Sequence, residues 1–509
     1  MPVTIVEIAC GGSHTCAILK DRQISCWGSG AYGQLGNGRT NNVGTYLATL
    51  DSLRQVPLGS GRNVTKISLG GRHTCVILDR GDLKCFGSNR YGQLGLEDTI
   101  DRGDTLLTGM GDALPKVSLG VGRTAVEVAT GLSHTCVLLD NHEVKCFGHN
   151  SYGELGLGDI INRGGRHGSM GDDLPSVDLG TNLKPIQITA GAYHTCVLLV
   201  DVSCSGLFRC KFPNKVACWG LGKYGQLGLG TTTKIADQAD ELGEQLRTVN
   251  LGTNDSVTSV KTGSYHTCAV FDFGGMKCWG RNNHGQLGSG NLGNVGDRPG
   301  EMGNVLKFVN VGKNRRVLNV VLGAYHTCVL LDNGGAKCFG NNVYGQLGYG
   351  DTLTRGDKAS TMGDHLQRID FRNYENRSVV SMSAGDEFCC ALFNDSTAEC
   401  WGHNSFGQLG LGDMLSHLSP AKVSWIGKQY PEQHIVTVDD GTLSRTRGSL
   451  VDANPVLLAV SFVLLGVIML GIGISYCKYC GSRKRVITVP LDTGAAEDEI
   501  STDTGSVAI

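Results

Sequence analysis

The four-residue sequence Gly-Gln-Leu-Gly occurs six times in this chain of 509 residues, and Gly-Glu-Leu-Gly makes a seventh copy. The copies begin at Gly33, Gly92, Gly153, Gly225, Gly285, Gly345 and Gly407. The steps between them are 59, 61, 72, 60, 60 and 62 residues. A sustained period of this length is typical of repeat architectures, in which each unit packs on its neighbours. A residue found in every unit is therefore expected to build the unit rather than to catalyse a reaction.

A second signature, Gly-x-x-His-Thr-Cys, precedes the first six copies. It begins at Gly11, Gly70, Gly131, Gly191, Gly263 and Gly323. The seventh unit departs from it and reads Gly-Asp-Glu-Phe-Cys-Cys from Gly385 to Cys390. The two signatures stay in register along the chain, which defines seven units.

Each unit contains four short apolar runs separated by turn residues. In the second unit they are residues 64–69, 74–78, 83–86 and 116–119. Short apolar runs split by Asp, Asn and Gly are typical of β-hairpins. Glycine, 75 residues in all, supplies the positive-φ turns that many strand connections need. The pattern predicts an all-β fold, a seven-bladed β-propeller of four-stranded blades over residues 1–428.

The two signatures resemble those of the regulator of chromosome condensation repeat family, over roughly residues 3–427. The resemblance implies a seven-bladed propeller. The best-known member of that family is a nuclear exchange factor for the Ran GTPase, and other members are secreted or bacterial proteins, including inhibitors that bind enzymes through one propeller face. The resemblance therefore implies the fold more firmly than the function.

The chain contains 20 cysteines, and fourteen of them form one pair per unit. The pairs are Cys16 with Cys26, Cys75 with Cys85, Cys136 with Cys146, Cys196 with Cys218, Cys268 with Cys278, Cys328 with Cys338, and Cys390 with Cys400. Six pairs are ten residues apart, so in an antiparallel hairpin the two cysteines face each other with Cα atoms about 4.5–5.5 Å apart. A disulfide bridges that distance. We predict seven hairpin disulfides and hence an oxidising compartment.

Two other readings of the cysteines remain. Buried cysteine also serves as a small apolar residue, although pairing in every unit favours disulfides. A metal site needs more ligands than two cysteines per blade, so we expect no metal. Of the remaining cysteines, Cys204 and Cys210 are expected to close a small loop. Cys10 and Cys389 lie in the first and last blades, and we predict a bridge between them that closes the ring.

Residues 455–476 form an uncharged apolar run of 22 residues. This is long enough to cross the roughly 30 Å hydrocarbon core as one transmembrane helix. Lys478 and residues 483–485 follow it, and an excess of Lys and Arg marks the cytoplasmic side. We predict a single-pass type I membrane protein whose propeller is extracellular or lumenal. Residues 429–454 are then a stalk and residues 477–509 a cytoplasmic tail. No N-terminal signal peptide is visible, so either the true start lies upstream or the C-terminal helix alone directs targeting.

Several sites of modification are compatible with this topology. The candidates for glycosylation are Asn63, Asn254, Asn376 and Asn394, each in an Asn-x-Ser/Thr sequon. Chance alone produces several sequons in a chain of this length. Cys477 and Cys480 follow the apolar run directly and are candidates for palmitoylation.

No catalytic constellation is apparent, and we expect neither enzyme activity nor a cofactor. The recurring histidines are His14, His73, His134, His194, His266 and His326. Each occupies the same place in its unit, and Phe388 replaces the seventh, so we expect a structural role. Two Arg-Gly-Asp triplets, at residues 102–104 and 355–357, resemble an integrin-binding motif. Related loops carry near-copies, so the triplets look like variants of the repeat consensus.

The largest departure from the repeat is an insertion at about residues 201–215. A Cys204–Cys210 bridge would display Leu207, Phe208 and Arg209 on a rigid loop. Exposed apolar and Arg side chains of this kind suit a binding hot spot. A neutral surface insertion is the alternative.

The net charge of −2 and the absence of a basic patch argue against nucleic-acid binding. Our first hypothesis is a membrane-anchored, non-catalytic binding module for a protein or glycan partner. The alternative is a regulatory propeller of the guanine-nucleotide-exchange type that faces the cytosol. An enzyme-inhibiting propeller would share the topology of the first hypothesis and differ only in its partner.

Overall fold

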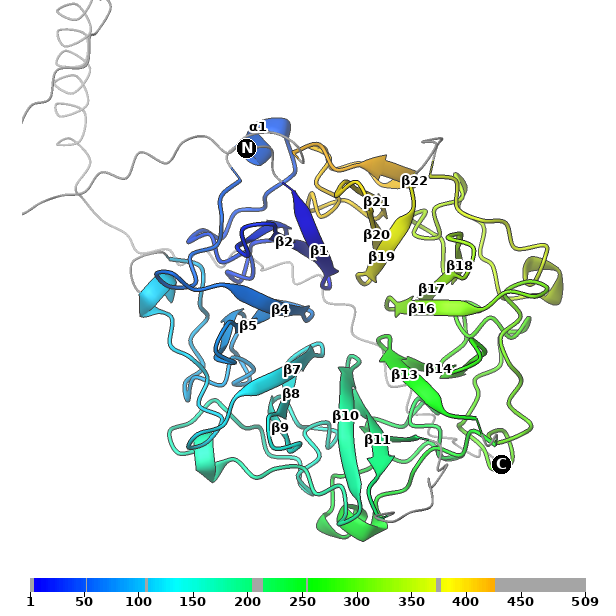
Figure 1. The fold of residues 1–509 in the computed structure, drawn as a ribbon, viewed down its shortest axis with the longest axis horizontal. Helices are drawn as coiled ribbons and strands as arrows, with labels where there is room; N and C mark the ends of the chain where they lie inside the picture. Colours follow the sequence, from blue (N-terminus) through cyan, green and yellow to red (C-terminus); the bar gives the residue numbers. More distant parts are fainter. Residues whose placement is uncertain are drawn as a thin grey trace, which may run out of the picture. The chain divides into compact units, whose positions relative to one another are not determined.

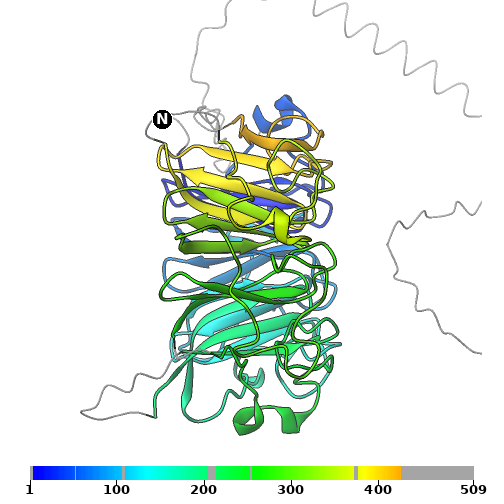
Figure 2. The same cartoon turned by 90° about the vertical axis from the view of Figure 1, so that its right-hand side faces the viewer.

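The computed structural model describes residues 4–51, 53–105, 109–203, 214–252, 255–371 and 377–425. The chain divides into two units, Met1–Gln433 and His434–Ile509, and every described residue belongs to the first. In that unit seven antiparallel sheets form a ring, with the first strand of each sheet nearest the centre (Figure 1). Figure 2 shows the same sheets from the side. The predicted all-β, seven-bladed propeller is confirmed.

Most sheets are three-stranded meanders of short strands. The strands are β1 (Ile5–Cys10), β2 (His14–Leu19) and β3 (Ile24–Gly28) in blade one; β4 (Val64–Leu69), β5 (His73–Leu78) and β6 (Leu83–Gly87) in blade two; β7 (Ala125–Thr130), β8 (His134–Leu139) and β9 (Val144–Gly148) in blade three; β10 (Leu183–Ala190), β11 (His194–Asp201) and β12 (Lys215–Gly220) in blade four; β13 (Val257–Thr262), β14 (His266–Phe271) and β15 (Met276–Gly280) in blade five; β16 (Val317–Leu322), β17 (His326–Leu331) and β18 (Ala336–Gly340) in blade six; and β19 (Val379–Ala384), β20 (Phe388–Phe393), β21 (Ala398–Gly402) and β22 (His417–Lys422) in blade seven. The helical elements described in full are α1 (Leu47–Asp51) and the 3₁₀ turns Gly111–Ala113, Gly171–Asp173, Ala239–Glu241, Gly243–Gln245 and Ala359–Thr361.

The prediction of four strands per blade is wrong for six of the seven sheets, because only blade seven adds a fourth strand, β22. In the other blades the fourth segment touches the third strand only at isolated pairs. In blade one, Val43 and Gly28 exchange two backbone hydrogen bonds of 3.0 and 2.7 Å. The next residue, Gly44, has φ 99° and turns the chain toward Gly407 of blade seven. A Cβ on Gly44 would lie 2.4 Å from the Gly407 carbonyl oxygen, so the chain leaves the sheet edge there.

The hydrophobic core lies between blades rather than inside any one of them. One cluster joins Ile18 and Ile24 of blade one to Val76 and Phe86 of blade two. The Trp or Phe that follows the second blade cysteine is buried in all seven blades; these residues are Trp27, Phe86, Phe147, Trp219, Trp279, Phe339 and Trp401. Each blade is therefore stabilised mainly by its neighbours, as expected of a repeat array.

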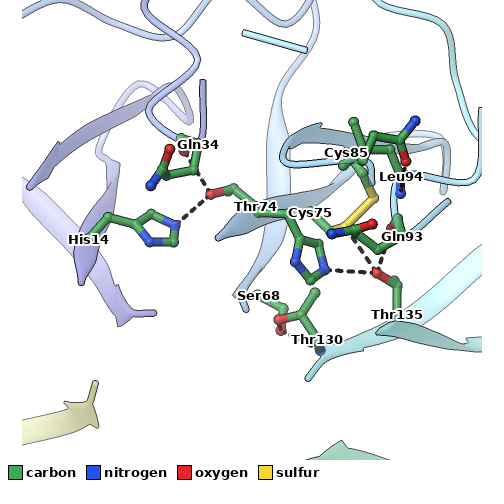
Figure 3. The surroundings of a disulfide bond; sticks show 12 residues. His14, Gln34, Ser68, Thr74, Cys75, Cys85, Gln93, Leu94, Thr130 and Thr135 are labelled. Atoms are coloured by element: carbon green, nitrogen blue, oxygen red, sulfur yellow. Dashed lines mark hydrogen bonds between the residues drawn. A yellow bond between two sulfur atoms is a disulfide. The ribbon is translucent and has the colours of Figure 1, made fainter. Parts of the chain in front are cut away.

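Each recurring histidine joins its blade to the next one. His14 Nε2 lies 2.9 Å from Thr74 Oγ1, and Thr74 Oγ1 donates to the Gln34 carbonyl oxygen at 2.9 Å (Figure 3). The threonine hydrogen is used on the carbonyl, so the imidazole must donate through Nε2–H. The same contact recurs with distances of 2.9–3.1 Å for His73–Thr135, His134–Thr195, His194–Thr267 and His266–Thr327. We call this His–Thr–carbonyl contact the interblade latch. Between blades six and seven Cys389 takes the place of the threonine and its Sγ lies 3.0 Å from His326 Nε2, so His326 is counted with the latch histidines. The histidines are structural, but they bind a side chain of the next blade rather than backbone.

A closed ring of backbone hydrogen bonds surrounds the central channel. The residue after the signature glycine donates its N–H to a carbonyl of the next blade. The seven bonds are Gly12 to Gly70, Gly71 to Gly131, Leu132 to Ala192, Ala192 to Ser264, Ser264 to Gly323, Ala324 to Asp386, and Asp386 to Gly12. The last of them closes the ring between blades seven and one. We call these seven bonds the backbone collar.

In the structure each blade pair of cysteines forms a disulfide. The paired cysteines are directly opposite each other in the second and third strands, as Cys75 and Cys85 are. Their Cα atoms are 4.1 Å apart in every pair. This Cα–Cα distance is shorter than the predicted range of about 4.5–5.5 Å.

The predicted Cys10–Cys389 bridge is wrong, because both thiols are free and buried. Cys10 ends the inner strand β1, and its sulfur lies 3.7 Å from the Ser383 carbonyl oxygen. Cys389 lies in β20 at the place of the recurring threonine, so its thiol faces blade six rather than blade one. Blades one and seven are held together without a covalent bond, by contacts such as Thr15 Oγ1 donating to the Gln408 carbonyl oxygen at 2.7 Å.

Other predictions fall outside the described residues. They concern the Cys204–Cys210 loop, the stalk at 429–454, the span at 455–476, and the tail at 477–509 with Cys477 and Cys480. Within the part of the chain that the structure describes, no helix has the length and apolarity needed to cross a bilayer.

The buried latch histidines should make the propeller sensitive to acid. Burial lowers the pKa of His14, His134, His194 and His266 to about 3, and the pKa of His73 and His326 to about 4. In the unfolded chain these groups titrate near the ordinary value of about 6.5. Between those values the unfolded state binds more protons, so stability falls as pH falls through this window.

When the pH is lowered from about 7.5 to about 5.5, each latch histidine should lower the free energy of unfolding by about 1.4 kcal/mol. Six histidines should together lower it by about 8 kcal/mol. Guanidinium midpoints at the two pH values measure the loss. His134→Phe, which copies the residue at Phe388, should remove one histidine's share of the pH dependence. Equal midpoints at both pH values would contradict this account.

Thr195 tests the latch itself. Thr195→Val leaves the His134 Nε2–H, now bonded at 3.0 Å, buried without its acceptor. It also removes the 2.9 Å bond to the Glu154 carbonyl, which keeps only its bond from Trp219 Nε1–H. The change should cost about 2–4 kcal/mol, read as a lower thermal midpoint. Thr258→Val, at an exposed position, is the matched control and should change stability by less than about 0.5 kcal/mol.

Candidate binding face

One end of every sheet collects side chains at positions that the two repeat signatures leave unspecified. In blade two, Leu69 pairs with Thr74 and His73 pairs with Gly87. The first strand therefore ends, the second begins and the third ends at the same end of the sheet. Three such positions lie there in each blade: before the recurring His, after the third strand, and before Gly-Gln-Leu-Gly. The last of them is Tyr in five of the seven units. We call this end of the propeller the turn face.

Aromatic side chains run continuously across the turn face from blade two to blade six. The set, which we call the aromatic arc, is Tyr91, His149, Tyr152, Tyr193, Tyr224, Tyr265, His284 and Tyr325. Ring centroids are 4.8 Å apart for Tyr91–His149, 5.2 Å for Tyr152–Tyr193, 6.3 Å for Tyr193–Tyr265, 6.2 Å for Tyr265–Tyr325 and 5.3 Å for His284–Tyr325. All eight side chains are half-buried, so the rings are held in place and still reach the surface.

Arg281 lies within the arc and contacts three of its tyrosines. Its guanidinium carbon is 4.7 Å from the ring centroid of Tyr224, 5.6 Å from that of Tyr265 and 5.2 Å from that of Tyr325. Contacts of this length are cation–π interactions. Arg281 Nε also donates to Asn283 Oδ1 at 3.1 Å. Burial raises the pKa of Tyr193 and Tyr265, so both keep their hydroxyl protons at neutral pH and can donate hydrogen bonds to a ligand.

Aromatic contacts continue on both sides of the arc. Arg72 lies 4.8 Å from the Tyr32 ring centroid and donates to the Tyr32 hydroxyl at 3.0 Å. In blades six and seven, Tyr344 and His403 have ring centroids 4.6 Å apart. Val343 nearby is 63% exposed. Rigid Tyr and Arg side chains beside exposed apolar residues are the composition of a protein-binding hot spot.

The turn face also surrounds the mouth of the central channel. A cavity of about 150 Å³ lies there, lined mainly by the glycine turns that form the backbone collar. Asp386 is the one charged residue among those that line it. Burial raises the pKa of both Asp386 and its neighbour Glu387. Cys10 also lines the cavity, and burial raises the pKa of its thiol to about 12, so the thiol stays protonated at neutral pH and is a poor nucleophile.

The structure explains the Arg-Gly-Asp triplets as parts of the repeat. The side chains of Arg102 and Arg355 are only 14% and 17% exposed, and each pairs with an Asp four residues earlier, at 2.6 and 2.8 Å. Gly103 packs against Gly33 of blade one, where a Cβ would lie 2.3 Å from a carbonyl oxygen. These triplets are interblade contacts, consistent with variants of the repeat consensus.

The other predicted sites are divided between described and undescribed residues. Asn63 and Asn394 are exposed, and glycosylation at both stays a prediction. Asn254, Asn376 and the loop residues Leu207, Phe208 and Arg209 lie outside the described residues.

Sequence reasoning missed the aromatic arc because its members come from three different positions of the repeat, which meet only in the folded ring. Two signals were available. The residue before the recurring His is Tyr in three successive blades, at Tyr193, Tyr265 and Tyr325, and the residue before Gly-Gln-Leu-Gly or Gly-Glu-Leu-Gly is Tyr in five of the seven units.

Comparison with known proteins agrees with the repeat geometry. The Regulator of chromosome condensation (RCC1) repeat matches residues 5–34, 64–93, 125–154, 257–286, 317–346 and 379–408 in one form, and residues 24–77, 80–138, 215–270 and 274–330 in another. Together these segments cover more than half of the chain. The chain belongs to the RCC1 repeat family.

Relatives in the family have different functions. The chain is 27% identical over 422 residues to the ultraviolet-B receptor UVR8 of Arabidopsis thaliana. This match covers 82% of this chain and 81% of the receptor. It is 30% identical over 234 residues to the probable E3 ubiquitin-protein ligase HERC4 of Homo sapiens, a match that covers 45% of this chain and only 19% of the ligase.

Two solved structures show the same fold. Human WBSCR16 matches with a TM-score of 0.58 and 22% identity, over 79% of this chain and 93% of that one. Prp20p of Saccharomyces cerevisiae, described with its binding to Gsp1p and histones, matches with a TM-score of 0.59 and 18% identity, over 83% and 87%. At these identities the likeness shows the fold alone.

Proposed function

We propose that this chain is a non-catalytic binding module: a single-pass, membrane-anchored propeller, extracellular or lumenal, that binds its partner through the aromatic arc. The arc carries the proposal, because eight half-buried rings and Arg281 form one prearranged surface across five blades. A preorganised surface loses little side-chain entropy on binding.

The geometry of the arc favours a protein over a glycan. Sugars stack on the open faces of aromatic rings, but most neighbouring rings here meet edge to face. The interplanar angles are 68° for Tyr152–Tyr193, 79° for Tyr224–Tyr265 and 64° for His284–Tyr325. Ring edges, tyrosine hydroxyls and one guanidinium suit the mixed polar and apolar surface of a protein.

The topology rests on the cysteines and on the apolar run at 455–476. Fourteen cysteines paired within hairpins are compatible with an oxidising compartment and are rare in cytosolic proteins. The alternative, a regulatory propeller facing the cytosol, draws on the 26% identity over 397 residues to the X-linked retinitis pigmentosa GTPase regulator homolog of Caenorhabditis elegans. The redox state of the cysteines separates the two.

The full-length chain, denatured directly from cells in a thiol-tagging reagent, should show the fourteen blade cysteines tagged only after reduction. Cys10 and Cys389, which are free in the structure, should be tagged without reduction and provide the internal control. Peptide mapping assigns each tag. Tagging of the blade cysteines before reduction would overturn the extracellular or lumenal topology.

The arc is tested on intact cells with a photo-reactive phenylalanine analogue in place of Val343. Irradiation should yield a discrete cross-linked adduct of the full-length chain, because Val343 is exposed beside the arc. Combining Tyr265→Ala with Arg281→Ala should abolish the adduct.

Phe273→Ala is the matched control for the cross-linking. Phe273 is an exposed aromatic residue, 43% accessible, in the β14–β15 turn at the opposite end of the sheet. This variant should retain the adduct. An adduct that survives the double substitution would place the binding surface elsewhere.

A further inference from the structure

The contact between blades six and seven holds a cluster of metal-type donors. His326 Nε2 lies 3.0 Å from Cys389 Sγ, and Cys389 Sγ lies 3.5 Å from Cys328 Sγ. These three donor atoms are all within 4.8 Å of one another, and their residues are buried. Cys338 Sγ is bonded to Cys328 Sγ, so a fourth donor atom adjoins one of these three.

The cluster arises from one change in the interblade latch. Elsewhere the residue at the place of Cys389 is threonine, and its hydroxyl approaches both the histidine and the first cysteine of the preceding blade. Thr135 Oγ1, for example, lies 3.0 Å from His73 Nε2 and 3.9 Å from Cys75 Sγ. A cysteine here keeps the geometry and replaces a poor metal ligand with a good one.

We propose that, when the Cys328–Cys338 disulfide is reduced, Cys328, Cys338, Cys389 and His326 form a zinc site. Three cysteines and one histidine are a ligand set of structural zinc sites, which are tetrahedral and closed to solvent. With Zn–S near 2.3 Å and Zn–N near 2.0 Å, tetrahedral geometry places the donors about 3.5–3.8 Å apart. The observed separations of 3.0 and 3.5 Å lie within about 0.5 Å of those values.

The reaction balances with one thiol- or phosphine-type reductant. Reduction takes two electrons and two protons and breaks the bond between Cys328 Sγ and Cys338 Sγ, while the reductant is oxidised. Zinc then displaces three thiol protons, and His326 binds as neutral imidazole through Nε2, with its proton on Nδ1. His326 Nδ1 has no hydrogen-bond partner among the described residues, so the site lacks the outer-shell acceptor that usually strengthens a histidine ligand.

The disulfide and the zinc site are mutually exclusive states of the same residues. In an oxidising compartment the blade-six disulfide forms, and in a reducing one zinc would link blades six and seven. The inference is independent of what the aromatic arc binds.

The full chain is purified in detergent, reduced with a phosphine in the presence of Zn²⁺, and then alkylated. Zinc should protect Cys328, Cys338 and Cys389, so that their alkylation slows at least tenfold. The other twelve blade cysteines belong to no three-donor group of this kind in the part of the chain that the structure describes, and they serve as the internal control. Alkylation of all the blade cysteines at similar rates would overturn the proposal.

Cys389→Thr supplies the matched variant, because it restores the residue that the other six blades carry. The reduced wild-type chain should retain one more equivalent of zinc after desalting than the variant, and with Co²⁺ it should show the absorption of tetrahedral, thiolate-bound cobalt. His326→Phe, which copies the residue at Phe388, should lose that absorption. Equal zinc content in wild type and Cys389→Thr would contradict the site even if both remain folded.

Discussion

The latch between adjacent blades is the contact on which the rest of the structure depends. A buried imidazole donates to a threonine of the next blade, and that threonine donates to a carbonyl of the Gly-Gln-Leu-Gly loop. The imidazole Nε2–H, the threonine hydroxyl and the carbonyl oxygen have no access to water, so they pair with one another inside the protein. The latch therefore sets the position of neighbouring blades from blade one to blade six, and the core side chains, the backbone collar and the turn face depend on that position.

Much of the fold could be predicted from the sequence, because the same pattern of strands, turns and cysteines recurs in seven units. The period indicates the blades, and the spacing of Cys75 and Cys85 predicts that they face each other. The prediction failed where a contact joins two blades. Cys389 looks like a partner for Cys10 if the ends of the chain are considered, but its register in β20 turns it toward His326. The prediction of four-stranded blades failed for a related reason. At Gly44 the chain leaves its own sheet and packs against Gly407 of the neighbouring blade.

The same repeat made the candidate binding surface hard to predict from the sequence. The recurring residues stand out in the sequence, but they build the propeller itself. The histidines form the latch, the Arg-Gly-Asp arginines form ion pairs, and the glycines allow close backbone contacts. The side chains left for function are those on the turn face, and the sequence alone does not show that Tyr91 and Tyr325 belong to one surface. Their placement follows only when the blades are arranged in a ring and equivalent positions become neighbours.

Among the described residues, blades one and seven exchange no strand. All described strands of blade one come from the start of the propeller and all those of blade seven from its end, and each disulfide that the structure describes lies within a single blade. The covalent cross-links thus strengthen each sheet but leave the seam between the two ends untouched. Under mechanical load on the chain, the ring would part along this seam with every hairpin intact. The ring of blades is therefore closed by non-covalent contacts at one defined interface, between blades one and seven.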